Sequence, residues 1–166
     1  MTERRSPLHT SALLVVLCVA GGAYGNACTP ESTPYVPVAD VAQIMTSVLE
    51  PAAETYWDAV GSILDQDGAH DFAPETDEEW DAVRNAAFVI AETGNLLMIE
   101  SRAPDQEGWI GMSQAMIEAG KRALAAAEAR DPEAVFDAGA EVYYTCSGCH
   151  TIYATETLRP SDESFR

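Results

Sequence analysis

The motif Cys146-Ser147-Gly148-Cys149-His150 constrains this chain more than any other feature of its sequence. Cys-x-x-Cys-His is the signature of covalent c-type haem attachment, in which both thiols add to haem vinyl groups and the histidine binds the iron. On a helix, Cys146, Cys149 and His150 stand at positions i, i+3 and i+4 and project from one face. We therefore expect one covalent haem c, held against one side of a helix.

A zinc site, a disulfide and a redox dithiol are alternative uses of the same residues. Structural zinc normally takes four Cys or His ligands, and no second ligand pair is formed by the remaining candidates, which are His9, Cys18, Cys28 and His70. A thioredoxin-like dithiol belongs to a βαβ context, which the sequence does not indicate. Haem c is thus the favoured interpretation of the motif.

The N-terminus has the pattern of an export signal. Arg4 and Arg5 precede an apolar stretch, 13–20, that is too short to cross a bilayer, and small residues follow up to Ala27. We predict a signal peptide over residues 1–27 and a periplasmic location, where c-type haem is attached in bacteria. No later segment has the pattern of a transmembrane helix.

Residues 28–37 contain three prolines, which indicates an extended linker rather than core. Cys28 is the first mature residue if cleavage follows Ala27, and such a cysteine is typical of a lipid-anchored bacterial protein. Gly25, however, stands where a leucine usually precedes a lipidated cysteine. The segment is therefore a Pro-rich linker or a lipoprotein tether, and both a lipid anchor at Cys28 and a free thiol stay open.

The chain of 166 residues is long enough for one domain with a sizeable core. It carries nine Lys and Arg against 27 Asp and Glu, a formal net charge of −18, and Lys121 is its only lysine. Such a surface repels nucleic acid and anionic lipid headgroups. It either favours a basic partner or simply keeps an exported protein soluble.

Apolar residues recur at helical spacing in four segments, over about 39–64, 76–103, 105–130 and 131–153. Pro51 lies inside the first and predicts a kink or a split at Glu50. No strand-like alternation stands out. Together these segments predict an all-α fold, an antiparallel four-helix bundle over residues 38–158 with haem near its C-terminus, followed by a polar tail over 159–166.

Local signals set the expected ends of these helices. Thr76 with Glu79 forms a capping box, while Asp105 and Asp131 are expected N-caps, the latter followed by a proline at the first helical position. The acidic segment 65–76 is predicted to be a loop with His70 on its surface. Its carboxylates do not match the spacing of a calcium-binding EF-hand.

An export signal, four helices and one Cys-x-x-Cys-His close to the C-terminus resemble the class II c-type cytochromes, the cytochrome c′ family, and especially its low-spin, Met-ligated relatives. The resemblance covers roughly residues 38–158. It implies that Cys146 and Cys149 form the haem thioethers and that His150 is the proximal iron ligand. It also implies that Met45, in the first helix, is the distal ligand. In five-coordinate members an apolar residue occupies the distal side, where small gases bind.

Other residues on the expected haem side are less specific. Met98, Met112 and Met116 are expected in the core, and the tryptophans Trp57, Trp80 and Trp109 in the core or half-buried. Tyr143 and Tyr153 share the haem-facing side, where they either contact the ring or take part in ordinary packing. The chain departs from the family in having no basic residue between the motif and Arg159.

We therefore expect a periplasmic mono-haem cytochrome that passes single electrons to redox partner proteins of the periplasm or membrane. It is not expected to be an enzyme or to bind nucleic acid, and both a monomer and a homodimer stay open. The alternative is a five-coordinate protein that binds nitric oxide or carbon monoxide. A helical envelope scaffold without haem is the third interpretation.

Overall fold

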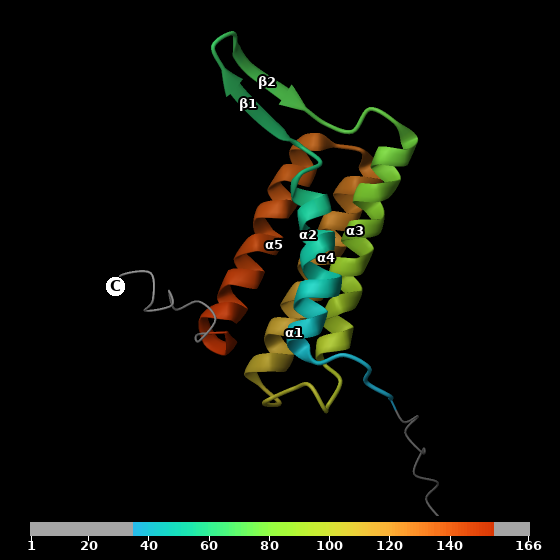
Figure 1. Ribbon diagram of the computed structural model, residues 1–166, viewed down its shortest axis with the longest axis vertical. Coiled ribbons are helices and arrows are strands. Elements are labelled where there is room, and N and C mark those ends of the chain that lie inside the picture. The colour runs from blue at the N-terminus through green and yellow to red at the C-terminus, as the bar shows by residue number, and fades with distance from the viewer. Residues whose placement is uncertain (1–34, 155–166) are drawn as a thin grey trace, which may run out of the picture. The chain divides into compact units, whose positions relative to one another are not determined.

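In the computed structural model, which describes residues 35–154, the chain is mostly helical with one small antiparallel sheet (Figure 1). Its elements are α1 (Val41–Ile44), the π-helical turn η1 (Met45–Leu49), α2 (Glu50–Trp57), β1 (Gly61–Asp65), β2 (Gly68–Phe72), α3 (Asp77–Leu97), α4 (Gly108–Ala129) and α5 (Pro132–Tyr153). The predicted signal peptide, Cys28 and residues 155–166 lie outside the described residues. No helix within 35–154 is long and apolar enough to cross a membrane.

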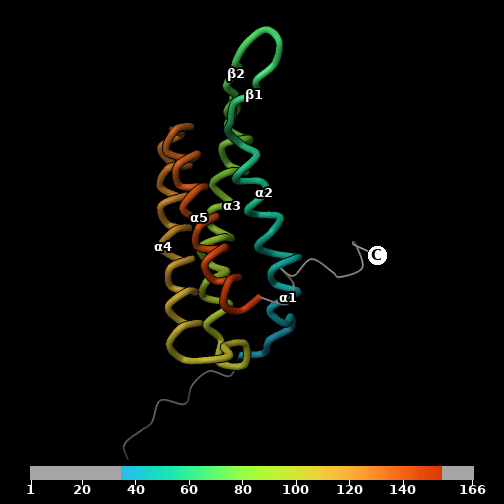
Figure 2. The backbone as a smooth tube through the Cα atoms, turned by 90° about the vertical axis from the view of Figure 1, so that its left-hand side faces the viewer, coloured from blue at the N-terminus to red at the C-terminus, as the bar shows by residue number. Residues whose placement is uncertain are grey.

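The long helices run side by side and reverse direction from one to the next (Figures 1 and 2). α3 packs along α4, α4 along α5 and α2 along α3, whereas α2 approaches α5 only loosely. Gly120 and Gly94 allow close contact between α3 and α4, because a Cβ atom would lie 2.6 Å from the Ala91 backbone at Gly120 and 2.6 Å from the Ser113 carbonyl at Gly94. The loose contact between α2 and α5 leaves room for a cavity, described below.

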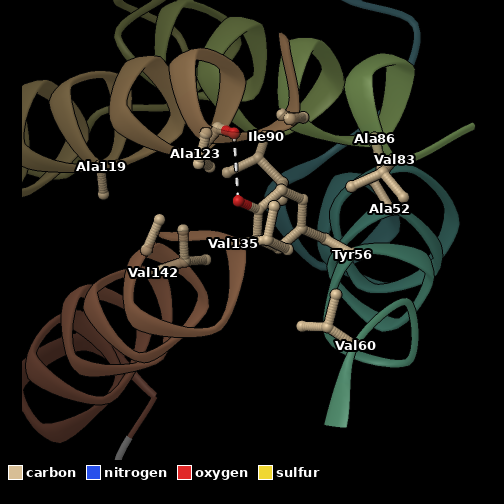
Figure 3. Close-up of a cluster of buried hydrophobic side chains, with 14 of the residues drawn as sticks. Ala52, Tyr56, Val60, Val83, Ala86, Ile90, Ala119, Ala123, Val135 and Val142 are labelled. Carbon is tan, nitrogen blue, oxygen red and sulfur yellow. Dashed lines mark hydrogen bonds between the residues drawn. The ribbon is translucent and has the colours of Figure 1, made fainter. Parts of the chain in front are cut away.

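Tyr56 lies at the centre of the main hydrophobic core (Figure 3). Its side chain is fully buried, and its hydroxyl donates a hydrogen bond to the Ala123 carbonyl at 3.0 Å. This hydrogen bond replaces the one that the Tyr56 hydroxyl would form with water if the side chain were exposed. Burial holds the pKa of Tyr56 far above its ordinary value of 10.0. The bond ties α2 to α4 across the core.

The segment 58–72 corrects the sequence prediction. The first helical region ends at Trp57 instead of Leu64, and residues 61–72 form a β-hairpin rather than helix end and loop. Ile63 pairs with His70, and the Asp65 carboxylate closes the turn by accepting the backbone N–H groups of Asp67 and Gly68. Short apolar runs fit a helix and a strand equally well, so the pairing across the two strands determines which of the two structures forms here. His70 is exposed, as predicted.

The Phe72 ring explains why a glycine begins β1. A Cβ atom at Gly61 would lie only 2.7 Å from this ring, so the ring covers the backbone at Gly61. Gly68, at the turn, has φ +131°, a backbone conformation that side chains rarely adopt. Gly61, which was predicted to be helical, therefore fits the hairpin, and Gly68 lies at a turn within the segment that was predicted to be a loop.

At Pro51 the predicted kink or split takes the form of a change of helix type, because the backbone stays helical from 41 to 57 while α2 begins at Glu50 directly after η1. Proline has no backbone N–H, and its ring clashes with the carbonyl four residues earlier. The preceding turn is accordingly π-helical, and the Glu50 N–H donates to the Met45 carbonyl five residues back. Such π turns are rare and frequently lie at functional sites.

Most of the predicted caps are confirmed. Thr76 and Glu79 form the capping box of α3, and the Asp131 carboxylate accepts the N–H groups of Glu133 and Ala134 at the start of α5. α4 begins at Gly108, three residues later than predicted. The Asp105 carboxylate nevertheless accepts the Trp109 N–H at 2.9 Å and so anchors the first turn.

Candidate functional site

The motif cysteines and histidine lie in the last turns of α5. Because α5 is helical through Tyr153, Cys146, Cys149 and His150 share one face, and each is half-buried. Both cysteines are free thiols. Burial, and secondarily the neighbouring Cys149, raises the pKa of Cys146 to about 11, and burial also raises the pKa of Cys149. The pair thus lacks the lowered thiol pKa that is typical of redox dithiols.

Met45 faces the motif from the first helical region. Its half-buried side chain packs against both hydrophobic clusters of the fold, and it begins the π-helical turn. α1 and the C-terminal end of α5 lie at the same end of the helices, opposite the hairpin (Figures 1 and 2). The fold therefore brings together two segments that lie near opposite ends of the described chain.

A cavity of about 490 Å³ separates these two segments. One wall comes from the first helical region and the other from α5; the lining residues are Met45, Leu49, Glu50, Ala53, Trp57, Tyr143, Cys146, Ser147, His150 and Thr151. The volume falls within the roughly 300–1,000 Å³ of cofactor and small-molecule sites. All the sequence-predicted site residues except Cys149 line the cavity, and Cys149 lies on the same helical face.

Sequence reasoning missed Leu49, Ala53 and Trp57 on the distal wall. Together with Met45 they recur at every fourth position. The π turn has i→i+5 hydrogen bonds and so holds more residues per turn than an α-helix, which keeps this spacing on one face. The four-residue spacing from Met45 to Trp57 was the available signal.

Trp57 bridges the two walls of the cavity. Its indole N–H donates to the Gly139 carbonyl of α5 at 2.9 Å. A Cβ atom at Gly139 would lie 3.1 Å from the indole, so glycine lets the ring rest on α5. This bridge fixes the width of the cavity where α2 and α5 would otherwise be loosely held.

Tyr153 takes the second of its two expected roles, ordinary packing, and it does not line the cavity. Its hydroxyl donates to the Asp105 carboxylate at 2.6 Å, and its ring packs edge-on against Trp109 with centroids 5.0 Å apart. The Trp109 indole in turn donates to the Leu97 carbonyl at 2.7 Å. These contacts fasten the end of α5, and with it the motif, to the connection between α3 and α4. Tyr143, by contrast, does line the cavity.

The Tyr153–Asp105 contact gives a pH prediction. The Tyr153 hydroxyl and then the Trp109 N–H hold the pKa of Asp105 below its ordinary value of 3.8. A carboxylate whose folded pKa is depressed stabilises the fold above its unfolded pKa, and this contribution is lost as pH falls through the folded pKa. We expect Asp105→Asn to lower the melting temperature at pH 7, and the difference from wild type to shrink as pH falls below 3.8.

Thermal unfolding of both proteins between pH 7 and pH 2, followed by circular dichroism, measures this difference. Asp67→Asn, in the exposed hairpin turn, controls for the loss of one carboxylate. A constant difference between wild type and Asp105→Asn across the pH range would contradict the prediction.

The remaining candidates are core residues or lie elsewhere. Met116, Trp80 and Trp109 are buried, whereas Met98 and Met112 are half-buried and do not line the cavity. Within residues 35–154, no three His, Cys, Asp or Glu side chains are grouped so that they could hold a metal ion.

No protein-family model matches the chain, and neither a curated protein nor a solved structure matches it.

Proposed function

We propose that this protein is an exported mono-haem c-type cytochrome that carries single electrons. In this proposal the helices form an antiparallel four-helix bundle of the class II type. One observation carries the proposal: Met45 and His150 line the same cavity as Cys146, in a fold whose motif helix presents both cysteines on one face. The N-terminal export signal supports a periplasmic location.

The chain's own residues have distinct roles in this proposal. Cys146 and Cys149 hold the haem through thioethers, His150 offers a ring nitrogen to the iron, and Met45 offers its thioether sulfur from the opposite wall. The apolar side chains of Leu49 and Ala53 exclude water beside Met45. When bound, the haem supplies a reversible one-electron couple. Methionine ligation and a low dielectric both favour the ferrous state.

The cavity wall that carries Met45 also favours a second function, gas binding. Leu49 and Ala53 give an apolar surface next to Met45, and Met45 is only half-buried. If its sulfur is not on the iron, this surface leaves an apolar distal side open to nitric oxide or carbon monoxide. The coordination state of the iron therefore distinguishes the electron carrier from the gas-binding protein.

The test is expression of the full chain in a bacterium that supplies haem maturation, followed by haem staining on a denaturing gel and absorption spectroscopy. We expect haem that survives denaturation, and a low-spin spectrum in both oxidation states that carbon monoxide does not alter. A high-spin spectrum that carbon monoxide shifts would favour the gas-binding function. Protein exported without covalent haem would refute both.

A further inference from the structure

Four aromatic side chains form an exposed patch beside the cavity. This aromatic patch consists of Trp57 on α2 and Phe136, Tyr143 and Tyr144 on α5, which are 36%, 63%, 57% and 72% exposed. Trp57 contacts Tyr143 edge-on at a centroid distance of 6.2 Å, and Tyr143 contacts Tyr144 in the same way at 6.0 Å. The four rings border a second, smaller cavity of about 310 Å³.

The aromatic patch is continuous with the candidate haem site. Trp57 and Tyr143 line both the large cavity and the smaller one, so their rings stand between the haem site and the outer rings of Phe136 and Tyr144. Clustered exposed aromatic rings are typical of protein interfaces, where tyrosine, tryptophan and phenylalanine are enriched. A partner seated on the patch would therefore lie against the edge of the haem site.

The surrounding charge selects the kind of partner. Residues 41–58 and 132–153, which include both walls of the haem cavity, carry six carboxylates and neither lysine nor arginine. The six are Glu50, Glu54, Asp58, Glu133, Asp137 and Glu141. Of these, within the part of the chain that the structure describes, Glu141 alone forms an ion pair, with Arg122. A second copy of the chain or an anionic membrane would bring like charges together on this face.

We propose that the aromatic patch is the docking surface for a basic redox partner protein, one that presents an apolar centre ringed by lysine and arginine. This inference rests on the proposed electron-carrier function. Opposite charges steer the partner to the face, and the exposed rings supply the apolar contact once water is excluded. The electron then leaves or enters beside Trp57 and Tyr143, at the edge of the haem site.

The test uses a basic mono-haem cytochrome c as probe, and the same probe with its lysines succinylated as the matched acidic control. Electron exchange with the holoprotein is followed by stopped flow at several salt concentrations. We expect faster exchange with the basic probe, and a rate that falls as salt rises. We expect Asp137→Lys to lower the low-salt rate about tenfold, and Phe136→Ser with Tyr144→Ser about fivefold.

Matched control variants lie at the turn of the hairpin, which lines neither of the two cavities beside the patch. Leu64→Ser removes a side chain that is 82% exposed, and Asp67→Lys makes the same charge change as Asp137→Lys. We expect both controls to change the rate less than about twofold, because their sites are not part of the patch. An equal decrease in the electron-exchange rate of patch and control variants, or no decrease in the patch variants, would overturn the proposal.

A binding measurement separates this inference from the proposed function. Amide chemical shifts of the labelled, exported protein are recorded as the basic probe is added at low salt. Shifts centred on residues 136–144 support docking at the patch, and shifts centred on the hairpin turn, residues 64–68, or spread evenly over the chain refute it. Shifts at the patch in a protein without covalent haem would refute the electron-carrier function while supporting the docking surface.

Discussion

Met45→Leu is expected to convert a low-spin haem spectrum into a high-spin spectrum that carbon monoxide shifts. Leucine keeps the volume and apolar character of the side chain, so the half-buried position at the cavity wall is preserved. It removes only the thioether sulfur, which is the proposed sixth ligand. The reduction potential should fall at the same time, because methionine ligation stabilises the ferrous state.

Absorption spectra of both oxidation states, with and without carbon monoxide, measure the effect, and Met112→Leu is the matched control. Met112 is half-buried like Met45 but lies on α4 outside the cavity, so its variant should keep the wild-type spectrum. An unchanged low-spin spectrum in Met45→Leu would show that Met45 is not an iron ligand. Wild-type protein that is already high-spin would shift the conclusion to gas binding.

The double substitution Cys146→Ser, Cys149→Ser is expected to abolish covalent haem and to destabilise the fold. Each thiol S–H adds across one vinyl double bond, and the serine hydroxyl is a far poorer nucleophile than sulfur. Without haem, the walls on α2 and α5 enclose a cavity of about 490 Å³ and lose the contacts that each would make with the haem. We expect the free energy of unfolding to fall by about 3 kcal/mol or more relative to the haem-bound protein.

Haem staining on denaturing gels and urea unfolding followed by circular dichroism measure these two effects. Ser147→Ala is the control inside the motif, since Ser147 lines the same cavity but has no proposed bond to haem. It should keep both haem content and stability. Full covalent haem in the double variant would contradict the assigned roles of Cys146 and Cys149.

Much of the helical structure was predictable because its signals are local. The capping box at Thr76, the Asp131–Pro132 start of α5 and the change of helix type before Pro51 each depend on hydrogen bonds or clashes within a few residues. The hairpin was not predictable in this way. In the hairpin, Ile63 pairs with His70 and the Phe72 ring packs over Gly61, so its contacts join residues on opposite sides of a turn. Short apolar runs in the sequence fit a helix and a strand equally well and do not predict such contacts.

The sequence by itself determined that Cys146, Cys149 and His150 share one face, because three- and four-residue spacing on a helix is a local property. Only the tertiary structure decided that Met45 lies across a cavity from His150 and that Tyr153 turns away to Asp105. Those outcomes depend on how distant helices pack. The loose approach of α2 to α5 and the contacts at Trp57 and Trp109 set that packing, and no spacing within one segment encodes it.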